Sequence, residues 1–430
     1  MSLFNSNQLR KYRYKISECM VIIGSEVITL EPMNVTGMKI INNYTSDTFP
    51  IFLLNLQVHS EVYYKINENK NILTIRLRVQ KYYTKDGKDK KFIDGDYIND
   101  EFVLIRDDND VNRTGDADRA EDKIEKRTKK SQSTKEPKHS MELYLYRKEV
   151  ATAMQTQLNE IFKQTTLTSA ISYLLYKIGI KNMLMSPLEN NTSYSPLYIP
   201  PLTLNMAIMY LDIMYGFYKA GAVLFFGLKR SYLLNYKGGC TAYETREKVN
   251  STLLIPRDGS PNNAQGGSVD TGDMSGYFYN VEYGSIEFSN NSVSSDVLNG
   301  TNALVVNTTD GSITTTTSNA ITSGDSNKTI MENTTANPWL ADIYAYQSSS
   351  SSEVLTGSIA DCDADGIEPN KNWSVIFEDV SLANKYRGTY FLANSILDFT
   401  NDVGSGDFSI VVGFTLNKIE KPVSTTVNMN

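Results

Sequence analysis

A chain of 430 residues, of which 40% are hydrophobic and 21% charged, is long enough for two or three domains with buried cores. The formal net charge of −7 argues against a nucleic-acid groove, because neutralising phosphates takes an excess of Lys and Arg. Cys19, Cys240 and Cys362 are widely separated and form no CxxC pair, which excludes a disulfide framework or a thiolate zinc site and predicts free thiols in a reducing compartment.

Neither a signal peptide nor membrane insertion is expected. The first apolar run is short and is flanked by Glu18 and Glu26. The apolar stretch at residues 206–228 contains charged residues and glycines, so it falls short of the roughly 18 uninterrupted apolar residues of a spanning helix.

The first hundred residues predict β-strands. Apolar and polar residues alternate in five runs, at residues 18–24, 27–35, 38–44, 49–58 and 73–83. In the last run, Leu73, Ile75, Leu77 and Val79 share one face, as in a strand buried on one side. Turn residues between the runs favour an antiparallel sheet or barrel, and residues 58–66 can form a short helix.

Residues 107–139 break this pattern. They contain nine acidic and nine basic residues, no aromatic residue and almost nothing to bury. Such a segment cannot recover its ordering entropy in a core. We interpret it as a flexible charged insertion between two hairpin strands, at residues 102–106 and 141–147.

A helical region follows. Thr168 is a candidate N-cap for a helix with an apolar stripe that ends at Gly179, and residues 150–162 carry a second helical stripe. Residues 181–188 have the pattern of a short strand.

Residues 196–236 predict a helix followed by a hairpin. Pro200 and Pro201 exclude a helix before residue 203, and Gly216 ends the helix that follows. Two apolar runs then pair as a hairpin. The polar groups here, Asp212, Lys219, Lys229 and Arg230, do not form an acid–base set, so we interpret this unit as a structural brace.

The remainder combines long polar loops with strands. Residues 256–352 are rich in Ser, Thr, Asn and Gly, and the polar stretch at 310–335 is the most biased part. Strand patterning returns at residues 372–380, 389–402 and 408–419, with a turn at 402–407. We expect these C-terminal strands to complete the N-terminal β unit.

One segment resembles half of a calcium loop. Asp361, Asp363 and Asp365 precede Gly366 with the spacing of such a loop, but position twelve is Asn372 in place of Glu, and no helix is predicted before the segment. We interpret it as an acidic surface turn and assign no metal ligand.

No catalytic or cofactor-binding residue is assigned. His59 and His139 are the only histidines, and both are interpreted as structural. Asp94 and Asp96 have the types needed for a glycosidase, but they lie in a glycine-containing turn where Asp is common for backbone reasons. The chain is predicted not to be an enzyme and to need no cofactor.

The order of these segments resembles the hub proteins of phage tails and baseplates, which cap the tail tube and hold the central spike. The resemblance lies in the strands at 49–58 and 73–83, the helix–glycine unit at 168–188, residues 198–235, residues 266–292 and the closing strands. The charged insertion at 107–139 and the polar stretch at 310–335 depart from it.

The resemblance implies an α+β, mainly β chain with two tube-type antiparallel β-barrel domains, helical and α+β insertions and long polar loops. It divides the chain into a first barrel (1–147), an insertion domain (148–255) and a second β-rich domain (256–430). It implies a homotrimer in the virion, assembled in the host cytoplasm, that contacts the tail tube, the central spike and other baseplate proteins. Passing DNA would be contacted only non-specifically, which suits an acidic chain.

Three alternatives remain open on the sequence. Another tail component, such as a tube terminator, a distal tail protein or a fibre-attachment protein, shares the β-rich, self-associating character. A tail-borne cell-wall hydrolase requires facing carboxylates or a zinc site. A calcium-stabilised adhesin fits the polar region and the Asp361–Asp365 segment.

Overall fold

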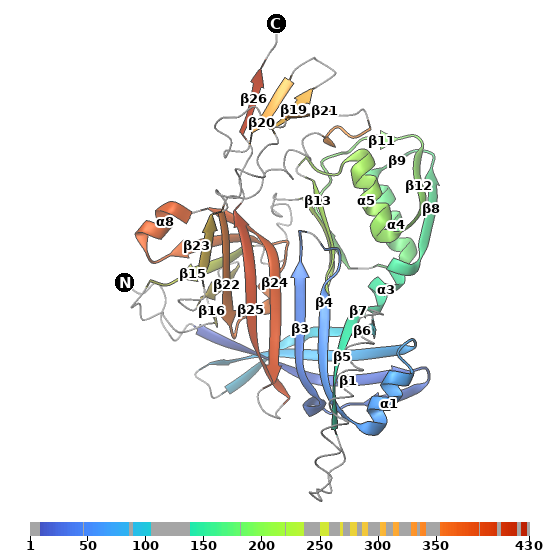
Figure 1. Ribbon diagram of the computed structural model, residues 1–430, viewed down its shortest axis with the longest axis vertical. Helices are drawn as coiled ribbons and strands as arrows, with labels where there is room; N and C mark the ends of the chain where they lie inside the picture. Colours follow the sequence, from blue (N-terminus) through green and yellow to red (C-terminus); the bar gives the residue numbers. More distant parts are fainter. Residues whose placement is uncertain are drawn as a thin grey trace, which may run out of the picture.

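A computed structural model of the chain shows a mainly β protein with a helical unit on one side (Figure 1). The structure describes residues 9–45, 47–85, 89–104, 138–180, 182–219, 221–235, 250–257, 267–269, 276–281, 286–290, 302–306, 313–317, 328–332, 336–340, 353–386, 388–401, 406–418 and 423–427. The charged insertion lies outside these residues almost entirely, as do Cys240 and the 402–405 part of the expected turn.

The main sheet contains a closed antiparallel circuit. Its strands, in spatial order, are β24 (Thr389–Asn401), β3 (Val35–Asn43), β4 (Ile51–His59), β7 (Lys138–Arg147), β6 (Asp89–Leu104), β5 (Leu73–Lys85), β1 (Leu9–Ile23) and β25 (Asp407–Lys418). Pairing of β24 with β25 closes the circuit. Strands from the two ends of the sequence therefore meet in one barrel, as predicted.

A second circuit shares β1, β24 and β25 with the first. It runs from β1 through β16 (Gly267–Val269), β17 (Tyr277–Asn280), β15 (Asn250–Ile255) and β23 (Asn372–Phe377) to β24, and returns along β25. β22 (Glu353–Ala360) and β18 (Glu287–Asn290) extend the sheet beyond β25. The predicted mainly β fold with two barrels is confirmed.

The second circuit is not purely antiparallel, and the expectation of wholly antiparallel barrels was wrong here. β15 runs parallel to both of its neighbours, β17 and β23. Parallel neighbours cannot be joined by a tight hairpin and need a long connection. The long polar stretch after residue 256 supplies this connection.

Alternation of side chains builds the barrel core. Leu73, Ile75, Leu77 and Val79 of β5 are all buried, with at most 2% of their surface exposed, as their spacing predicts. They join a continuous core that includes Tyr14, Phe52, Phe102, Phe399 and Phe408. Pairing of β6 with β7 also confirms the two predicted strands that flank the charged insertion.

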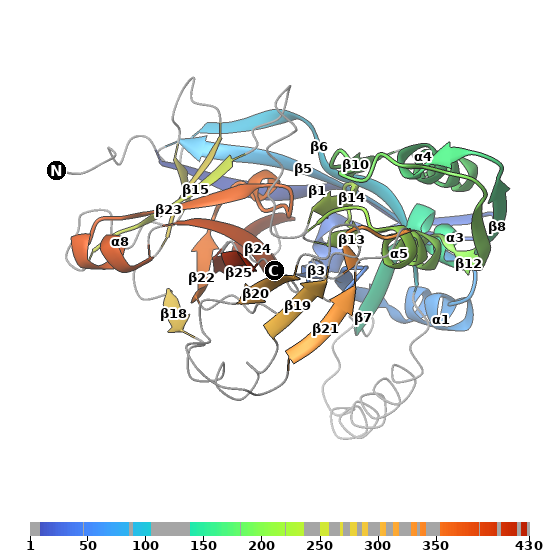
Figure 2. The ribbon, with the colours of Figure 1, turned by 90° about the horizontal axis from the view of Figure 1, so that it is seen from above.

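A helical unit has a core of its own beside the barrels. It consists of α3 (Lys148–Gln155), α4 (Leu167–Ile178), α5 (Leu204–Tyr215), the pair β8 (Gln157–Phe162) and β12 (Leu197–Thr203), and the pair β9 (Thr165–Thr166) and β11 (Ser193–Tyr194). Figure 2 shows this unit at one end of the molecule.

Two local expectations for this unit were wrong. The N-cap of α4 is Thr166, whose hydroxyl accepts a hydrogen bond from the Ser169 amide at 3.3 Å, and not Thr168. Residues 157–162 form a strand instead of continuing the helical stripe, because they pair with β12 and bury Leu158. The predicted end of α4 at Gly179, with φ of 88°, is confirmed.

A hairpin joins the helical unit to the barrels. β13 (Ala222–Phe226) pairs with β14 (Ser231–Asn235), which also pairs with β10 (Met183–Met185). Val223 and Phe225 belong to the barrel core, whereas Phe226 and Leu233 belong to the helical core. The hairpin is therefore buried on both faces, as a brace between two cores requires.

Smaller elements complete the described chain. They are β2 (Glu26–Thr29), the 3-10 turns η2 (Pro32–Asn34) and η3 (Ala364–Gly366), α1 (Ser60–Glu68), α8 (Val380–Tyr386), and a separate sheet of β19 (Asn302–Val306), β20 (Ile313–Thr317), β21 (Lys328–Glu332) and β26 (Val423–Val427). Among the described helices, none is long and apolar enough to cross a bilayer.

Candidate functional site

The loop that joins β22 to β23 gathers several buried charged and polar side chains. This loop was expected to be an acidic surface turn, and that expectation was wrong: Cys362, Asp363, Glu368 and Lys371 are all at most 9% exposed. The loop folds inward because side chains of the second circuit satisfy its backbone. Its partners are Tyr14 on β1, Ser251 on β15, Ser268 on β16 and Tyr279 on β17.

Lysines from two other parts of the chain meet the carboxylates of this loop. Lys81 Nζ on β5 lies 2.7 Å from Asp363 Oδ1 and also contacts Asp365. Lys229, in the turn of the β13–β14 hairpin, contacts the other oxygen of Asp365. Asp365 thereby joins the barrel wall to the hairpin, and we call Lys81, Lys229, Asp363 and Asp365 the ionic junction.

Burial and charge act in opposite directions on the pKa values of the junction. Burial lowers the pKa of Lys81, but the carboxylates of Asp363 and Asp365 raise it by more, so the net pKa lies above its usual value. Burial raises the pKa of Asp365, but Lys229 and Lys81 lower it by more. The net pKa of this carboxyl therefore lies well below its usual value. Lys81 and Asp365 are therefore both charged at neutral pH.

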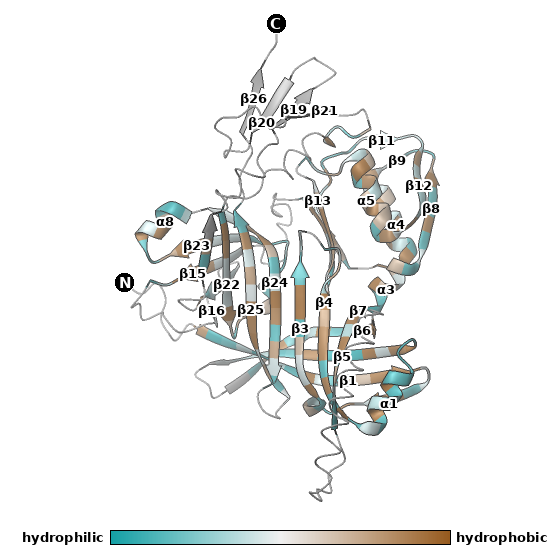
Figure 3. Ribbon diagram, viewed as in Figure 1, coloured by the Kyte–Doolittle hydropathy of each residue, from teal (hydrophilic) through white to brown (hydrophobic). Residues whose placement is uncertain are grey.

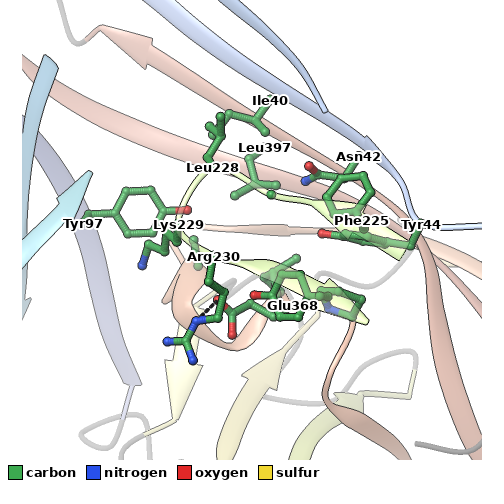
Figure 4. A pocket seen from close by; sticks show the side chains of 15 residues that line it. Ile40, Asn42, Tyr44, Tyr97, Phe225, Leu228, Lys229, Arg230, Glu368 and Leu397 are labelled. Atoms are coloured by element: carbon green, nitrogen blue, oxygen red, sulfur yellow. Dashed lines mark ion pairs between the residues drawn. The ribbon is translucent and has the colours of Figure 1, made fainter. Parts of the chain in front are cut away.

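A small cavity adjoins the junction (Figure 4). Its volume is about 50 Å³, well below the roughly 300–1,000 Å³ of small-molecule sites. Lys229 Nζ stands 3.9 Å from the ring centre of Tyr97, and Arg230 Nε lies 3.9 Å from Glu368 Oε1. Burial raises the pKa of Glu368, whereas Arg230 and neighbouring lysines lower it by less. The cavity is thus a small gap between closely packed charged groups, and it is too small for a typical small-molecule ligand.

The calcium-like carboxylates already have protein cations as partners. Arg13 contacts Asp361, Lys81 contacts Asp363, and both lysines of the junction contact Asp365. Among the residues that the structure describes, no group of three or more His, Cys, Asp or Glu is arranged to hold a metal ion.

The other residues considered from the sequence lie outside the ionic junction and form no common site with it. His139 Nε2 is 3.0 Å from Ser60 Oγ, and its ring stacks on Tyr63, next to the end of β4 that carries His59. Asp96 accepts a hydrogen bond from Arg78 at 2.7 Å, so it belongs to a surface ion pair between β5 and β6. Asp94 lies on the same strand, β6, and is exposed.

The polar residues of the predicted brace were underestimated. Lys229 and Arg230 both contact the 361–371 loop, whereas Asp212 lies at the end of α5 and accepts a hydrogen bond from the Phe217 amide at 2.9 Å. The backbone amide of Lys219 donates to Glu189. A signal for the junction existed in the sequence, because Lys81 continues the inward-facing series Leu73–Val79 at a spacing of two.

The fold and the junction define a class of protein: a double-barrel scaffold in which buried charges link the barrel wall to the β13–β14 hairpin. The chain belongs to the family described as the bacteriophage PBS1 gene 109 protein, which it matches over residues 4–419. The resemblance to phage proteins predicted from the sequence is thereby confirmed. No curated protein sequence matches the chain.

Several solved structures are similar. The tail protein from Neisseria meningitidis is 11% identical with a TM-score of 0.49, over 95% of this chain and 97% of that one. The 43 kDa tail protein of prophage MuSo2 from Shewanella oneidensis is 12% identical with a TM-score of 0.48, over 93% and 96% of the two chains. The E. coli c3393 protein, described as a type VI secretion component with structural similarity to the T4 tail proteins gp27 and gp5, is 9% identical with a TM-score of 0.40, over 95% and 77%.

Proposed function

We propose that this protein is a structural hub of a phage tail or baseplate, which caps the tail tube and links it to the central spike as a homotrimer. One observation carries the proposal: a single chain contains two closed strand circuits that share the wall of β1, β24 and β25. Three copies then present six barrels, which matches a tube of sixfold symmetry.

The internal ties of the chain support a load-bearing role. The β13–β14 hairpin is buried on both faces, and the ionic junction connects that hairpin to the barrel wall. Packed interiors of this kind transmit strain with little deformation. A hub between a tube and a spike needs this stiffness.

We propose that the role is not enzymatic and that the protein assembles in the host cytoplasm into the virion, where other baseplate proteins surround it. The inward-facing carboxylates of the junction serve as partners of lysines, which supports a structural use of these groups. We further propose that residues 1–147 supply the first barrel, which β24 and β25 of the second β-rich part (256–430) complete. Residues 148–255 form the insertion, whose last strand, β15, joins the second circuit.

Counting subunits tests the proposal. Mass measurement on the purified full-length chain should give three times its 48.3 kDa. A hexamer would favour a tube terminator or distal tail protein, and robust turnover of peptidoglycan by the protein would overturn the non-enzymatic role.

A further inference from the structure

A second, larger cavity lies between α5 and the hairpin, away from the ionic junction. Its volume is about 320 Å³, within the range of small-ligand sites. Its walls come from the segment after β3, from α5 and from β13 and β14; the residues are Tyr44, Thr45, Asp47, Thr48, Ile208, Met209, Asp212, Ile213, Phe217, Ala222, Val223, Leu224 and Leu233.

Hydrogen bonds fix the walls of this cavity before anything binds. The Phe226 amide donates to the Thr48 carbonyl at 2.8 Å, which ties the segment after β3 to the hairpin. Tyr44 packs edge-on against Phe225, and its amide donates to the Ala393 carbonyl. A preformed site loses less conformational freedom when a ligand enters it.

The chemistry of the lining is apolar with two carboxyl groups. Most of the lining residues are aliphatic or aromatic, and no lysine or arginine is among the described residues that line the cavity. Of the two aspartates in the lining, Asp212 is half-buried and Asp47 is exposed. Burial raises the pKa of Asp212 to about 6, although the amides of Phe217 and Ala222 lower it. A carboxylate accepts about four hydrogen bonds, so Asp212 retains acceptor capacity beyond these two amides.

Met209 and Ile213 form an exposed apolar rim of the cavity, and Met206 and Met214 are exposed on the same helix. Four side chains of α5 are strongly exposed: Met206 at 55%, Met209 at 48%, Ile213 at 64% and Met214 at 43%. The opposite face of α5, with Leu204, Ile208 and Leu211, is buried in the helical core, so the helix is apolar on both sides. Figure 3 shows α5 mostly in the hydrophobic colour. Exposed Met-rich helix faces are characteristic of surfaces that bind other polypeptides.

We propose that this cavity and its rim form a docking site for a lysine side chain that a partner protein presents between apolar residues. The aliphatic stem of the lysine lies against Ile208, Met209 and Ile213, and the ammonium group meets Asp212. The apolar neighbours of that lysine cover the exposed methionines. Charge complementarity selects this partner, because the ammonium compensates the carboxylate of Asp212, which lies half-buried among apolar residues.

Two short peptides provide the direct test on the full-length protein. Acetyl-Leu-Lys-Leu-amide and acetyl-Leu-Gln-Leu-amide are titrated at pH 7.5 while the methyl signals of ¹³C-labelled Met209 and Met206 are followed by NMR. We expect the lysine peptide to bind at least about tenfold more tightly than the glutamine peptide, since a desolvated ion pair is worth more than a neutral contact. Equal affinities would overturn the proposal.

Protonation gives a second readout. The titratable groups lining the cavity are Tyr44, Asp47 and Asp212. With a pKa of about 6, Asp212 is mostly ionised at pH 7.5 and only about one-tenth ionised at pH 5, so the preference for the lysine peptide should fall several-fold at pH 5. An unchanged preference between these pH values would contradict the assigned role of Asp212.

Variants locate the binding. Asp212→Asn should remove most of the preference for lysine, and Ile213→Ser, at an exposed rim position that costs little folding energy, should weaken both peptides. Tyr176→Ser on α4, which is 84% exposed and does not line the cavity, serves as the matched control and should change nothing. Binding that survives both rim and cavity variants would refute the site. Hexylammonium that binds as tightly as the lysine peptide would refute the partner segment, because flanking apolar residues would then contribute nothing.

Discussion

Removing Lys81 from the ionic junction should cost far more stability than removing a surface lysine. The side chain of Lys81 is 7% exposed and those of its partners Asp363 and Asp365 are 12% and 30% exposed. Lys81→Met retains the length of the stem but leaves Asp363 buried without its lysine. Breaking a buried pair from one side costs about 3–5 kcal/mol.

The control is Lys65→Met. Lys65 Nζ lies 2.8 Å from Glu26 Oε1 and 3.0 Å from Glu61 Oε1, but the side chain is 37% exposed, and solvent-exposed ion pairs contribute little to stability. The two variants make the same chemical change to a lysine with two carboxylate partners, once at a buried and once at an exposed position. The comparison therefore shows how much more a buried ion pair contributes to stability than an exposed one.

Urea unfolding at pH 7, followed by tryptophan fluorescence, measures both losses. Trp373 is fully buried and stacks on Tyr279, whose hydroxyl donates to the Asp363 carbonyl at 2.7 Å, so its emission reports on the loop. We expect the midpoint to shift strongly for Lys81→Met and little for Lys65→Met. Adding Asp363→Asn to Lys81→Met should recover part of the loss, because the uncompensated charge is removed. Equal, small losses for the two lysine variants would refute the reasoning.

Three further predictions concern the same scaffold. Lysines hold the pKa of Asp365 below its unfolded value near 4, so its contribution to stability is present above that pH and is lost as the pH falls below it. In acid unfolding, the stability of Asp365→Asn should therefore decline less steeply with falling pH than that of the wild type. The pKa of Asp212 is shifted in the opposite direction, to about 6, so stability falls as the pH rises from about 4 to 6. Asp212→Asn should therefore raise the stability measured by thermal unfolding at pH 7 by up to about 3 kcal/mol, and a loss of stability would contradict this. Gly366→Ala would place its Cβ 1.9 Å from the Tyr279 hydroxyl and should lower the melting temperature strongly, whereas Gly413→Ala, with its nearest contact at 3.8 Å, should have a small effect; similar losses would show that the loop can yield.

Local patterns predicted the elements well where one physical signal dominated. The period of two at Leu73–Val79, the glycine cap at Gly179 and the prolines before α5 each fix a local conformation regardless of the rest of the chain. The same signals did not specify β8, because a strand that depends on pairing with β12 can carry an apolar spacing that also fits a helix.

The ionic junction could be predicted only in part. Lys81 at an inward position was a usable sign of a buried cation, but its partners are 282 and 284 residues away in the sequence. The loop around Asp363 looked like a surface turn because its own sequence is acidic. It is buried because residues from β5 and from the β13–β14 turn compensate its charges. Burial of a charged loop is a property of its tertiary partners and cannot be derived from its own composition.

The central claim is that two barrels in one chain assemble as a threefold hub. Electron microscopy of the purified full-length protein, combined with mass measurement in solution, tests it most directly. We expect closed rings of three chains in which six barrels surround one axis. A stable monomer at high concentration, or rings of six chains, would contradict it.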